Sequence, residues 1–226
     1  MKNRKFSALI FDFDGLILDT EEPAYQAWQE IYQEYGCVLP LSTWVAVIGT
    51  SDHSFDPISD LSEKSGKTLD RVLVTARHRA REVELIQSQA ILPGVMDYLV
   101  DARRLGLKIG LASSSSCRWV TGHLERLGLL SYFDCICASD DVDRTKPDPA
   151  LYLAALAGLN VLADEAIAFE DSLNGVLAAK RAGLFCVVVP NSMTRHLPLD
   201  EADLRLISLA DLQLKDLVVT ARLPTV

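Results

Sequence analysis

The chain has 226 residues, of which 49% are hydrophobic and 23% are charged. These proportions are typical of a folded protein, and the length leaves room for one large domain or two small ones. Its 31 acidic residues outnumber its 22 basic residues, and the formal net charge is −9. Because no block of Lys or Arg is present, we expect no nucleic-acid partner. An anionic ligand would have to meet local positive charge or a bound cation.

No apolar run approaches the roughly 18 residues that indicate a membrane-spanning helix. The apolar run near the N-terminus is interrupted by Asp12 and Asp14, so it does not match a signal peptide. The five cysteines are scattered and include no CxxC pair. We therefore expect reduced thiols, no membrane association and a cytoplasmic location.

Five short apolar runs are each followed by a turn and then by residues at helical spacing. Because the runs are apolar on both faces, they suit strands of a parallel sheet that is covered by helices on both sides. This alternation predicts an α/β fold with a doubly wound parallel sheet. The expected strands are 8–11, 107–112, 133–138, 166–169 and 185–189, and the helical patterns between them include 95–102, 120–127 and 173–177. One more short apolar run lies near 206–209, and we expect a short helix after it.

Residues 20 to about 90 contain no convincing strand pattern and carry apolar residues at helical spacing instead. Such spacing predicts two amphipathic helices, and Gly36 lies where the first should stop. We therefore expect residues 1–19 and 91–226 to form the α/β domain, and residues 20–90 to form a helical domain inserted into it. The apolar positions are Ala24, Trp28, Ile31 and Tyr35 in the first helix, and Leu69, Val72, Leu73, Ala76, Ala80 and Val83 in the second.

Side chains that can bind a ligand follow four of the predicted strands. In an open α/β sheet, ligands bind just beyond the carboxyl ends of the strands, so these residues should share one edge of the sheet. Together they provide carboxylates, a hydroxyl and an ammonium group. The residues are Asp12 and Asp14 after the first strand, Ser113 after the second, Lys146 after the third, and Glu170 and Asp171 at the end of the fourth.

A cluster of carboxylates would repel itself unless a cation were bound there. Carboxylate oxygens suit a hard ion, and Mg²⁺ typically uses one or two carboxylates while it keeps several waters. Softer metals would need His or Cys ligands, which this set lacks. We therefore expect Mg²⁺ to bridge the carboxylates and a substrate phosphate. Lys146 would add positive charge, and Ser113 with the N–H groups of the next helix would bind the phosphate.

Asp12 and Asp14 would then have different roles. A carboxylate can attack phosphorus to give an aspartyl phosphate, and Asp12 lies at the strand end. Asp14 could protonate the leaving group and later deprotonate the water that hydrolyses the intermediate. Gly15 lets the chain turn sharply after this pair. The sequence thus predicts a phosphohydrolase that acts on a small phosphorylated metabolite.

The chain resembles the haloacid dehalogenase-like superfamily in four motifs, which occur in the right order and span essentially the whole chain. The resemblance extends to the branch with a helical cap inserted after the first motif, which includes β-phosphoglucomutase-like proteins and sugar-phosphate phosphatases. The motifs are Asp12-Phe13-Asp14-Gly15, Ser113, Lys146 before Pro147, and Glu170-Asp171.

The resemblance implies a nucleophile, an acid/base residue, a magnesium site and phosphate ligands. These are Asp12 as nucleophile; Asp14 as acid/base; Asp12, the Asp14 carbonyl and Asp171 for Mg²⁺, with Glu170 at the metal or just behind it; and Ser113 and Lys146 for the phosphoryl group, with Ser114 as a further candidate. Specificity should be set by the cap and its hinge loops. The candidates there are Thr20, Glu21 and Ser51.

Three other activities compete with hydrolysis. A haloacid dehalogenase would leave Asp14 and the pair Glu170-Asp171 without a role. A non-catalytic protein that binds phosphorylated metabolites would need neither the nucleophile nor the proton donor. A phosphomutase would need a cap that grips a second phosphate and keeps water from the aspartyl phosphate.

The cap sequence favours hydrolysis over the phosphomutase. Members that resemble β-phosphoglucomutase often carry a His in the first cap helix and an Arg soon after a cap Gly. The matching positions here are Ala24 and Gly49-Thr50-Ser51, without an Arg. Other basic cap residues could compensate, so the phosphomutase stays an alternative. These residues are Lys64, Lys67, Arg71, Arg77, Arg79 and Arg81.

Overall fold

The structure, a computed structural model, describes residues 6–45 and 55–221. Its six strands form a parallel sheet in the order β3-β2-β1-β4-β5-β6. β1 lies in the interior of the sheet, between β2 on one side and β4 on the other. The strands are β1 (Ala8–Phe11), β2 (Lys108–Ala112), β3 (Cys135–Cys137), β4 (Ala166–Glu170), β5 (Phe185–Val188) and β6 (Leu204–Arg205).

The five predicted strands are confirmed, each within two residues of its expected bounds. The apolar run at 206–209 follows the sixth strand rather than forming it, because β6 pairs with β5 at Leu204–Arg205. The chain then makes a turn of 3₁₀ helix and ends its described part in α9 (Leu214–Thr220), the expected short helix.

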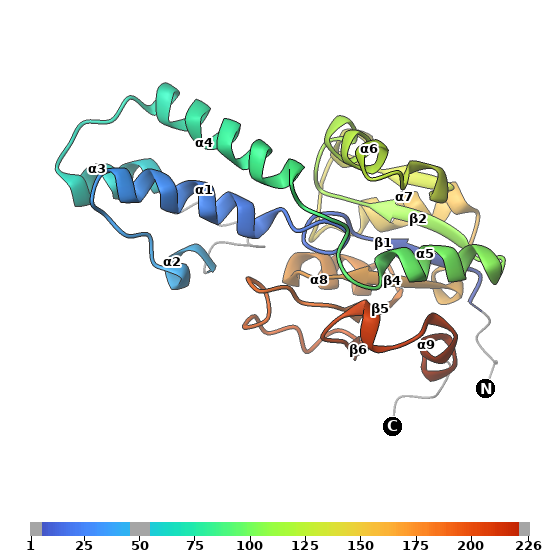
Figure 1. Ribbon diagram of the computed structural model, residues 1–226. Coiled ribbons are helices and arrows are strands. Elements are labelled where there is room, and N and C mark those ends of the chain that lie inside the picture. Colours follow the sequence, from blue (N-terminus) through green and yellow to red (C-terminus); the bar gives the residue numbers. More distant parts are fainter. Residues whose placement is uncertain (1–5, 46–54, 222–226) are drawn as a thin grey trace.

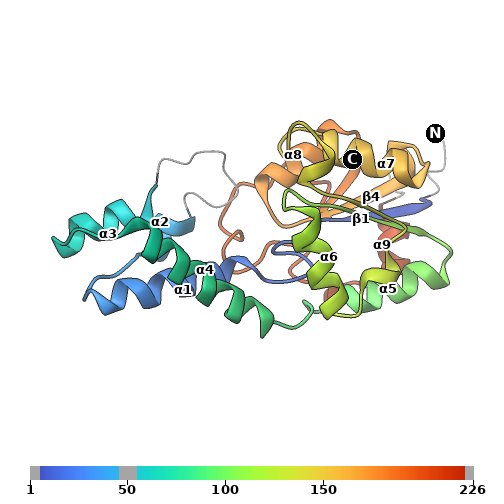
Figure 2. The same ribbon diagram turned by 90° about the horizontal axis from the view of Figure 1, so that it is seen from above.

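Helices cover both faces of the sheet (Figure 2). The helices α5 (Val95–Arg104), α6 (Cys117–Arg126) and α9 cover one face, and α7 (Ala150–Leu159) and α8 (Leu173–Arg181) cover the other. Along β1, Leu9 and Phe11 pack in the first of these layers, whereas Ala8 and Ile10 pack in the second. Because successive side chains of a strand point to opposite faces, this double burial explains the continuous apolar run.

Four of the described helices lie between β1 and α5 in the chain and extend away from the sheet (Figure 1). We call them the cap: α1 (Glu21–Glu34), α2 (Leu41–Val45), α3 (Pro57–Ser65) and α4 (Arg71–Gln87). Trp28 and Tyr32 of α1 pack against Leu61 of α3 and Val74 of α4. The predicted helical insertion after β1 is therefore confirmed, and its helices share one hydrophobic cluster, which Met193 also joins. The division of the chain at residues 20 and 90 stays a prediction.

The apolar face predicted for α4 is not the buried one. Val72 and Leu73 are 81% and 57% exposed, whereas Val74 is only 4% exposed. The inner face is occupied in part by His78, whose ring stacks on Trp28 with 4.3 Å between ring centroids. The spacing predicted the helix correctly. It did not predict the buried face, because the His78 ring packs on Trp28 of α1 and a hydrophobic pattern does not include histidine.

None of the described helices is both long and apolar enough to cross a membrane. All five cysteines are free thiols.

Gly94 is needed where α5 begins. Its φ is +84°, and a Cβ there would clash with the backbone nitrogen of Ala210. We expect Gly94→Ala to lower the free energy of unfolding by about 2–4 kcal/mol, because left-handed strain adds to a clash with a backbone atom. Gly36→Ala is the matched control, since Gly36 also has a positive φ, +69°, but faces open space. Its loss should be only about 1 kcal/mol. Equal losses in urea denaturation would show that the close contact does not matter.

Candidate active site

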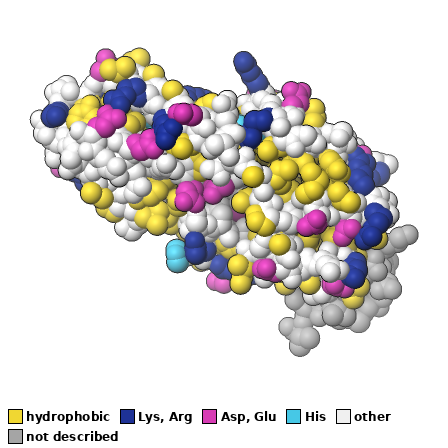
Figure 3. All heavy atoms as spheres, viewed as in Figure 1, with side chains coloured by type: hydrophobic (Ala, Val, Ile, Leu, Met, Phe, Trp, Pro, Cys, Tyr) yellow, Lys and Arg dark blue, Asp and Glu magenta, His cyan; other side chains and the backbone are white. Residues whose placement is uncertain are grey.

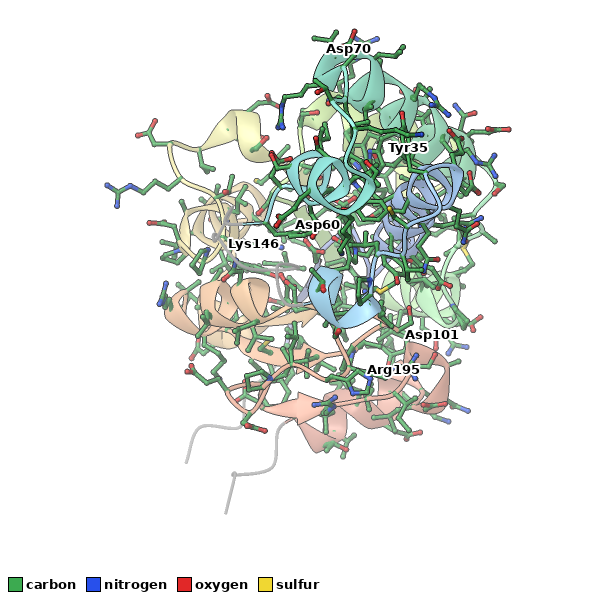
Figure 4. The ribbon with its side chains drawn as sticks, turned by 90° about the vertical axis from the view of Figure 1, so that its left-hand side faces the viewer. Tyr35, Asp60, Asp70, Asp101, Lys146 and Arg195 are labelled. Atoms are coloured by element: carbon green, nitrogen blue, oxygen red, sulfur yellow. The ribbon has the colours of Figure 1, made fainter. Side chains whose placement is uncertain are left out.

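The candidate site lies at the carboxyl ends of β1 and β4, where the order of the strands in the sheet reverses. Ligands of open α/β sheets bind at such points. A cavity of about 400 Å³ lies there, between the sheet edge and the cap. Viewed from the cap end, Lys146 lies near the middle of the molecule, and Asp70 lies at the outer edge of the cap (Figure 4). The described lining comprises Asp12, Asp14, Ser114, Ser115, Trp119, Thr145, Lys146, Asp171, Ser172 and Asn174, with Thr20, Glu21, Ala24 and Glu82 on the cap side.

Three carboxylates and one ammonium group lie together at this place, and all of them except the Glu170 carboxylate line the cavity. Asp12, Glu170 and Asp171 are 6%, 0% and 3% exposed, and each offers an oxygen within 4.8 Å of the others. Lys146 forms an ion pair with Asp12 and a second with Glu170, whose Oε1 lies 2.6 Å from Lys146 Nζ. One ammonium group cannot balance three carboxylates. Protons or a bound cation must therefore supply the remaining positive charge.

The pKa values reflect this imbalance. Burial raises the pKa of Asp12 to about 8; Lys146 opposes the rise, and Glu170 and Asp14 add to it. Burial, Asp12 and Glu170 likewise raise the pKa of Asp171. A divalent cation among these oxygens would favour their ionised forms. Because the donors are carboxylate oxygens without His or Cys, the residues present fit a hard metal ion.

Glu170 is fixed through both of its carboxylate oxygens. Its Oε1 accepts hydrogen bonds from Lys146 and, at 2.6 Å, from Tyr152 Oη, while its Oε2 accepts one from the N–H of Asp171 at 3.2 Å. A Cβ on Gly175 would clash with this carboxylate, so a glycine is needed where α8 approaches it. Glu170 thus holds the Lys146 ammonium group beside Asp12.

Asp171 is held by Asn191, which follows β5. Asn191 Nδ2 donates to Asp171 Oδ2 at 2.8 Å and to the Gly15 carbonyl at 3.3 Å. Gly15 has a φ of +80°, and a Cβ there would clash with Asp171. The expected sharp turn after Asp14 is therefore present, and it requires glycine both for its backbone conformation and for space.

The Asp14 carboxylate is held by residues that follow β2. Its Oδ2 accepts hydrogen bonds from Ser115 Oγ at 2.7 Å and from Ser113 Oγ at 3.3 Å, and its Oδ1 accepts one from Trp119 Nε1 at 3.0 Å. This carboxylate lines the cavity with Asp12 but is not part of the three-carboxylate group. The metal contact expected of Asp14 uses its backbone carbonyl and stays a prediction.

The serines after β2 lie in different environments. Ser113 is fully buried, and its Oγ accepts from the Ser115 N–H at 3.0 Å while it donates to Asp14. Ser114 and Ser115 line the cavity, and Ser116 caps the N-terminus of α6. The structure therefore joins Ser113 to Asp14. Phosphate binding by Ser113 and Ser114 stays a prediction.

Two of the three expected recognition residues line the cavity. They are Thr20 and Glu21, whereas Ser51 lies outside the described residues. Burial raises the pKa of Glu21 to about 7, and the charges of Asp14, Asp19 and Glu82 add to this effect.

Sequence reasoning missed several residues at the site, among them Trp119, Tyr152, Asn191 and Glu82. Asn191 follows the fifth strand, so the rule that ligands bind beyond strand ends could have found it. The other three lie within helices. Their contacts depend on how α6, α7 and α4 pack, and no spacing in the sequence signals that.

The parallel sheet, the helical insertion after β1 and the acidic site define an α/β enzyme with a cap. The sequence pattern of the haloacid dehalogenase-like hydrolases matches residues 9–189. The chain belongs to this family.

Three similar proteins also support membership of this family. The chain is 51% identical over 207 residues to Bacillus subtilis (strain 168) YhcW, provisionally assigned as a phosphatase, covering 92% of this chain and 94% of that one. It is 32% identical over 179 residues to the phosphorylated carbohydrates phosphatase of Thermotoga maritima, covering 78% and 82%. A solved Thermotoga maritima structure, provisionally assigned as a β-phosphoglucomutase, matches with a TM-score of 0.79 at 29% identity, covering 94% and 98%. The predicted fold and family branch are confirmed.

We expect the folded protein to become more stable when a divalent cation binds at Asp12, Glu170 and Asp171. We expect a divalent cation at 100 times its Kd to stabilise the wild type by about 2.7 kcal/mol, or roughly 5–10 °C in Tm. Asp171→Asn removes one oxygen anion from the group. It should be at least as stable as the wild type in EDTA and gain little from the cation.

Thermal unfolding in EDTA and in MgCl₂ measures this coupling. Asp164→Asn is the control, because Asp164 is an exposed carboxylate before the opposite end of β4. A cation-induced rise in Tm as large in Asp171→Asn as in the wild type would exclude Asp171 from the metal site.

Proposed function

We infer that the chain is a phosphoric monoester hydrolase of the haloacid dehalogenase-like family. We propose that it is Mg²⁺-dependent and hydrolyses a small phosphorylated carbohydrate or similar metabolite through an aspartyl phosphate. The observation that carries the proposal is the buried Asp12, paired with Lys146 and grouped with Glu170 and Asp171 beside a 400 Å³ cavity. A cavity of this size suits a small metabolite.

The proposed reaction has two steps. Asp12 attacks phosphorus, so that an Asp12 Oδ–P bond forms, the bond from phosphorus to the leaving oxygen breaks, and Asp14 protonates that oxygen. Asp14 then accepts a proton from water, which attacks the aspartyl phosphate and releases inorganic phosphate and free Asp12. Lys146 neutralises charge on the phosphoryl oxygens, and the N–H groups at the start of α6 favour an anion there.

Asp12, Asp171 and the Asp14 carbonyl would hold Mg²⁺, with Glu170 at the metal or just behind it. The ion would supply positive charge for the phosphoryl group. The contacts of Glu170 with Lys146 and Tyr152 favour a position behind the metal, because one of its oxygens already accepts two hydrogen bonds.

The residues that line the cavity also help to distinguish hydrolysis from the three alternative functions. Ala24 lines it where a phosphomutase of this branch often has a His, and none of the six basic cap residues named above lines it. This supports transfer of the phosphoryl group to water. A dehalogenase or a non-catalytic binding protein would leave the arrangement of Asp14, Ser115 and Trp119 without a purpose.

Activity is tested with p-nitrophenyl phosphate and a panel of sugar phosphates, in Mg²⁺ and in EDTA. We expect phosphate release in Mg²⁺, loss of most activity in EDTA, and a fall in kcat of at least about 1,000-fold in Asp12→Asn, which cannot form the intermediate. No phosphate release from any substrate would refute the hydrolase. Formation of an isomeric sugar phosphate would establish the phosphomutase instead.

Trp119 should position the acid/base group. Trp119→Phe keeps the aromatic ring but removes the N–H that Asp14 Oδ1 accepts. Because a hydrogen bond to a charged group contributes about 1.5–3 kcal/mol and two serine donors remain, we expect kcat to fall about tenfold with little change in KM. Steady-state kinetics measures kcat and KM separately. Wild-type kcat in Trp119→Phe would mean that the indole acts only through packing.

A further inference from the structure

The inner face of α4 carries polar side chains between buried apolar ones. Val74, His78, Glu82 and Ile86 recur every four residues, and Val74 and Ile86 are 4% and 0% exposed. The Glu82 side chain is only 26% exposed, whereas Val72 on the outer face is 81% exposed. Burial of a carboxylate costs free energy that burial of an apolar side chain would not. The position of Glu82 therefore requires an explanation other than packing.

Glu82 faces the cavity from the cap side, together with Glu21 and Ala24. His78 does not neutralise it, because His78 Nδ1 lies 3.9 Å from Glu82 Oε2 and burial lowers the pKa of this histidine. Burial raises the pKa of Glu82 itself, the nearby Arg79 opposes this, and Asp14 adds to it. The part of the cavity that faces the cap is therefore lined by acidic groups.

Positive charge is scarce in this cavity. Among the described residues that line it, Lys146 is the only Lys or Arg, and it is already paired with two carboxylates. Arg77 and Arg81 pair with glutamates of α1, and the surface of the cap shows basic side chains beside acidic ones (Figure 3). A second anionic group on a substrate would meet carboxylates here.

We propose that Glu82, together with Glu21, selects substrates whose leaving group carries hydroxyl groups and no second phosphate or carboxylate. This proposal rests on the phosphatase function above and narrows its substrates to monophosphates of sugars or polyols. The carboxylate oxygens accept hydrogen bonds from hydroxyls of the leaving group, as charged acceptors do strongly. They repel a second phosphate, which a phosphomutase of this fold would need to hold.

The expected discrimination is large. Like unit charges about 6 Å apart, at an effective dielectric constant of about 20, repel enough to reduce kcat/KM by about 100-fold. Loss of a hydrogen bond to a charged acceptor costs about tenfold or more. Both effects predict a preference for monophosphates that depends on Glu82.

The test compares kcat/KM for a sugar monophosphate with that for the bisphosphate of the same sugar, in Mg²⁺. Suitable pairs are fructose 6-phosphate with fructose 1,6-bisphosphate, and glucose 6-phosphate with glucose 1,6-bisphosphate. We expect the wild type to prefer the monophosphate by at least about 30-fold. Glu82→Gln, which keeps the shape of the side chain, should reduce this preference about tenfold. Glu82→Lys should abolish it.

Glu84→Gln is the matched control. It changes the charge of the same helix equally, but Glu84 is 70% exposed and pairs with Arg81 outside the cavity lining. This variant should keep the wild-type preference. Thermal unfolding of each variant checks that it is folded.

The outcomes separate this proposal from the phosphatase function. No hydrolysis of p-nitrophenyl phosphate or of any sugar phosphate would overturn both. Hydrolysis of p-nitrophenyl phosphate but of neither monophosphate would overturn the hydroxylated leaving group alone. Equal rates on monophosphate and bisphosphate, or the same preference in Glu82→Gln as in the wild type, would overturn the role of Glu82 and leave the phosphatase intact.

Discussion

The structure depends on a group of three buried carboxylates with one lysine beside them. Asp12 follows β1, Glu170 is the last residue of β4 and Asp171 follows it. Lys146 forms ion pairs with Asp12 and Glu170. This group forms because β1 and β4 are neighbours in a parallel sheet, so that their carboxyl ends meet. The residues around this group leave space for the carboxylates and hold them by hydrogen bonds. Glycine is required where α8 approaches Glu170, and polar side chains from outside the four motifs hold the carboxylates in place.

The same imbalance of charge connects stability with chemistry. Buried like charges disfavour the folded state unless protons or a cation accompany them. The raised pKa of Asp12, about 8, expresses that cost in the protein alone. A site with this deficit of positive charge favours a metal ion, and a metal ion beside Lys146 favours a phosphate. Asp14 is held by its own donors, Ser115 and Trp119, outside the group of three carboxylates.

The cap completes the cavity with acidic rather than basic side chains. In the described part of the chain, Arg77 and Arg81 of the cap form ion pairs with glutamates of α1. No described Lys or Arg of the cap lines the cavity, whereas Glu21 and Glu82 do. A phosphate is therefore attracted only to the sheet edge, where Lys146 lies. The leaving group meets hydrogen-bond acceptors instead. This asymmetry gives the two ends of a substrate different environments, and it agrees with hydrolysis of a monoester better than with transfer between two phosphate positions.

The sequence by itself determined the parallel sheet, the helical insertion and the side chains that gather at the sheet edge. It could do so because buried strands and strand-end residues are local patterns, and a parallel sheet brings strand ends together whatever the helices do. Only the tertiary structure decided which face of α4 is buried, that Tyr152 and Trp119 hold Glu170 and Asp14, and that Glu82 faces the cavity. These contacts depend on the rotation and docking of helices, which spacing along the chain does not specify.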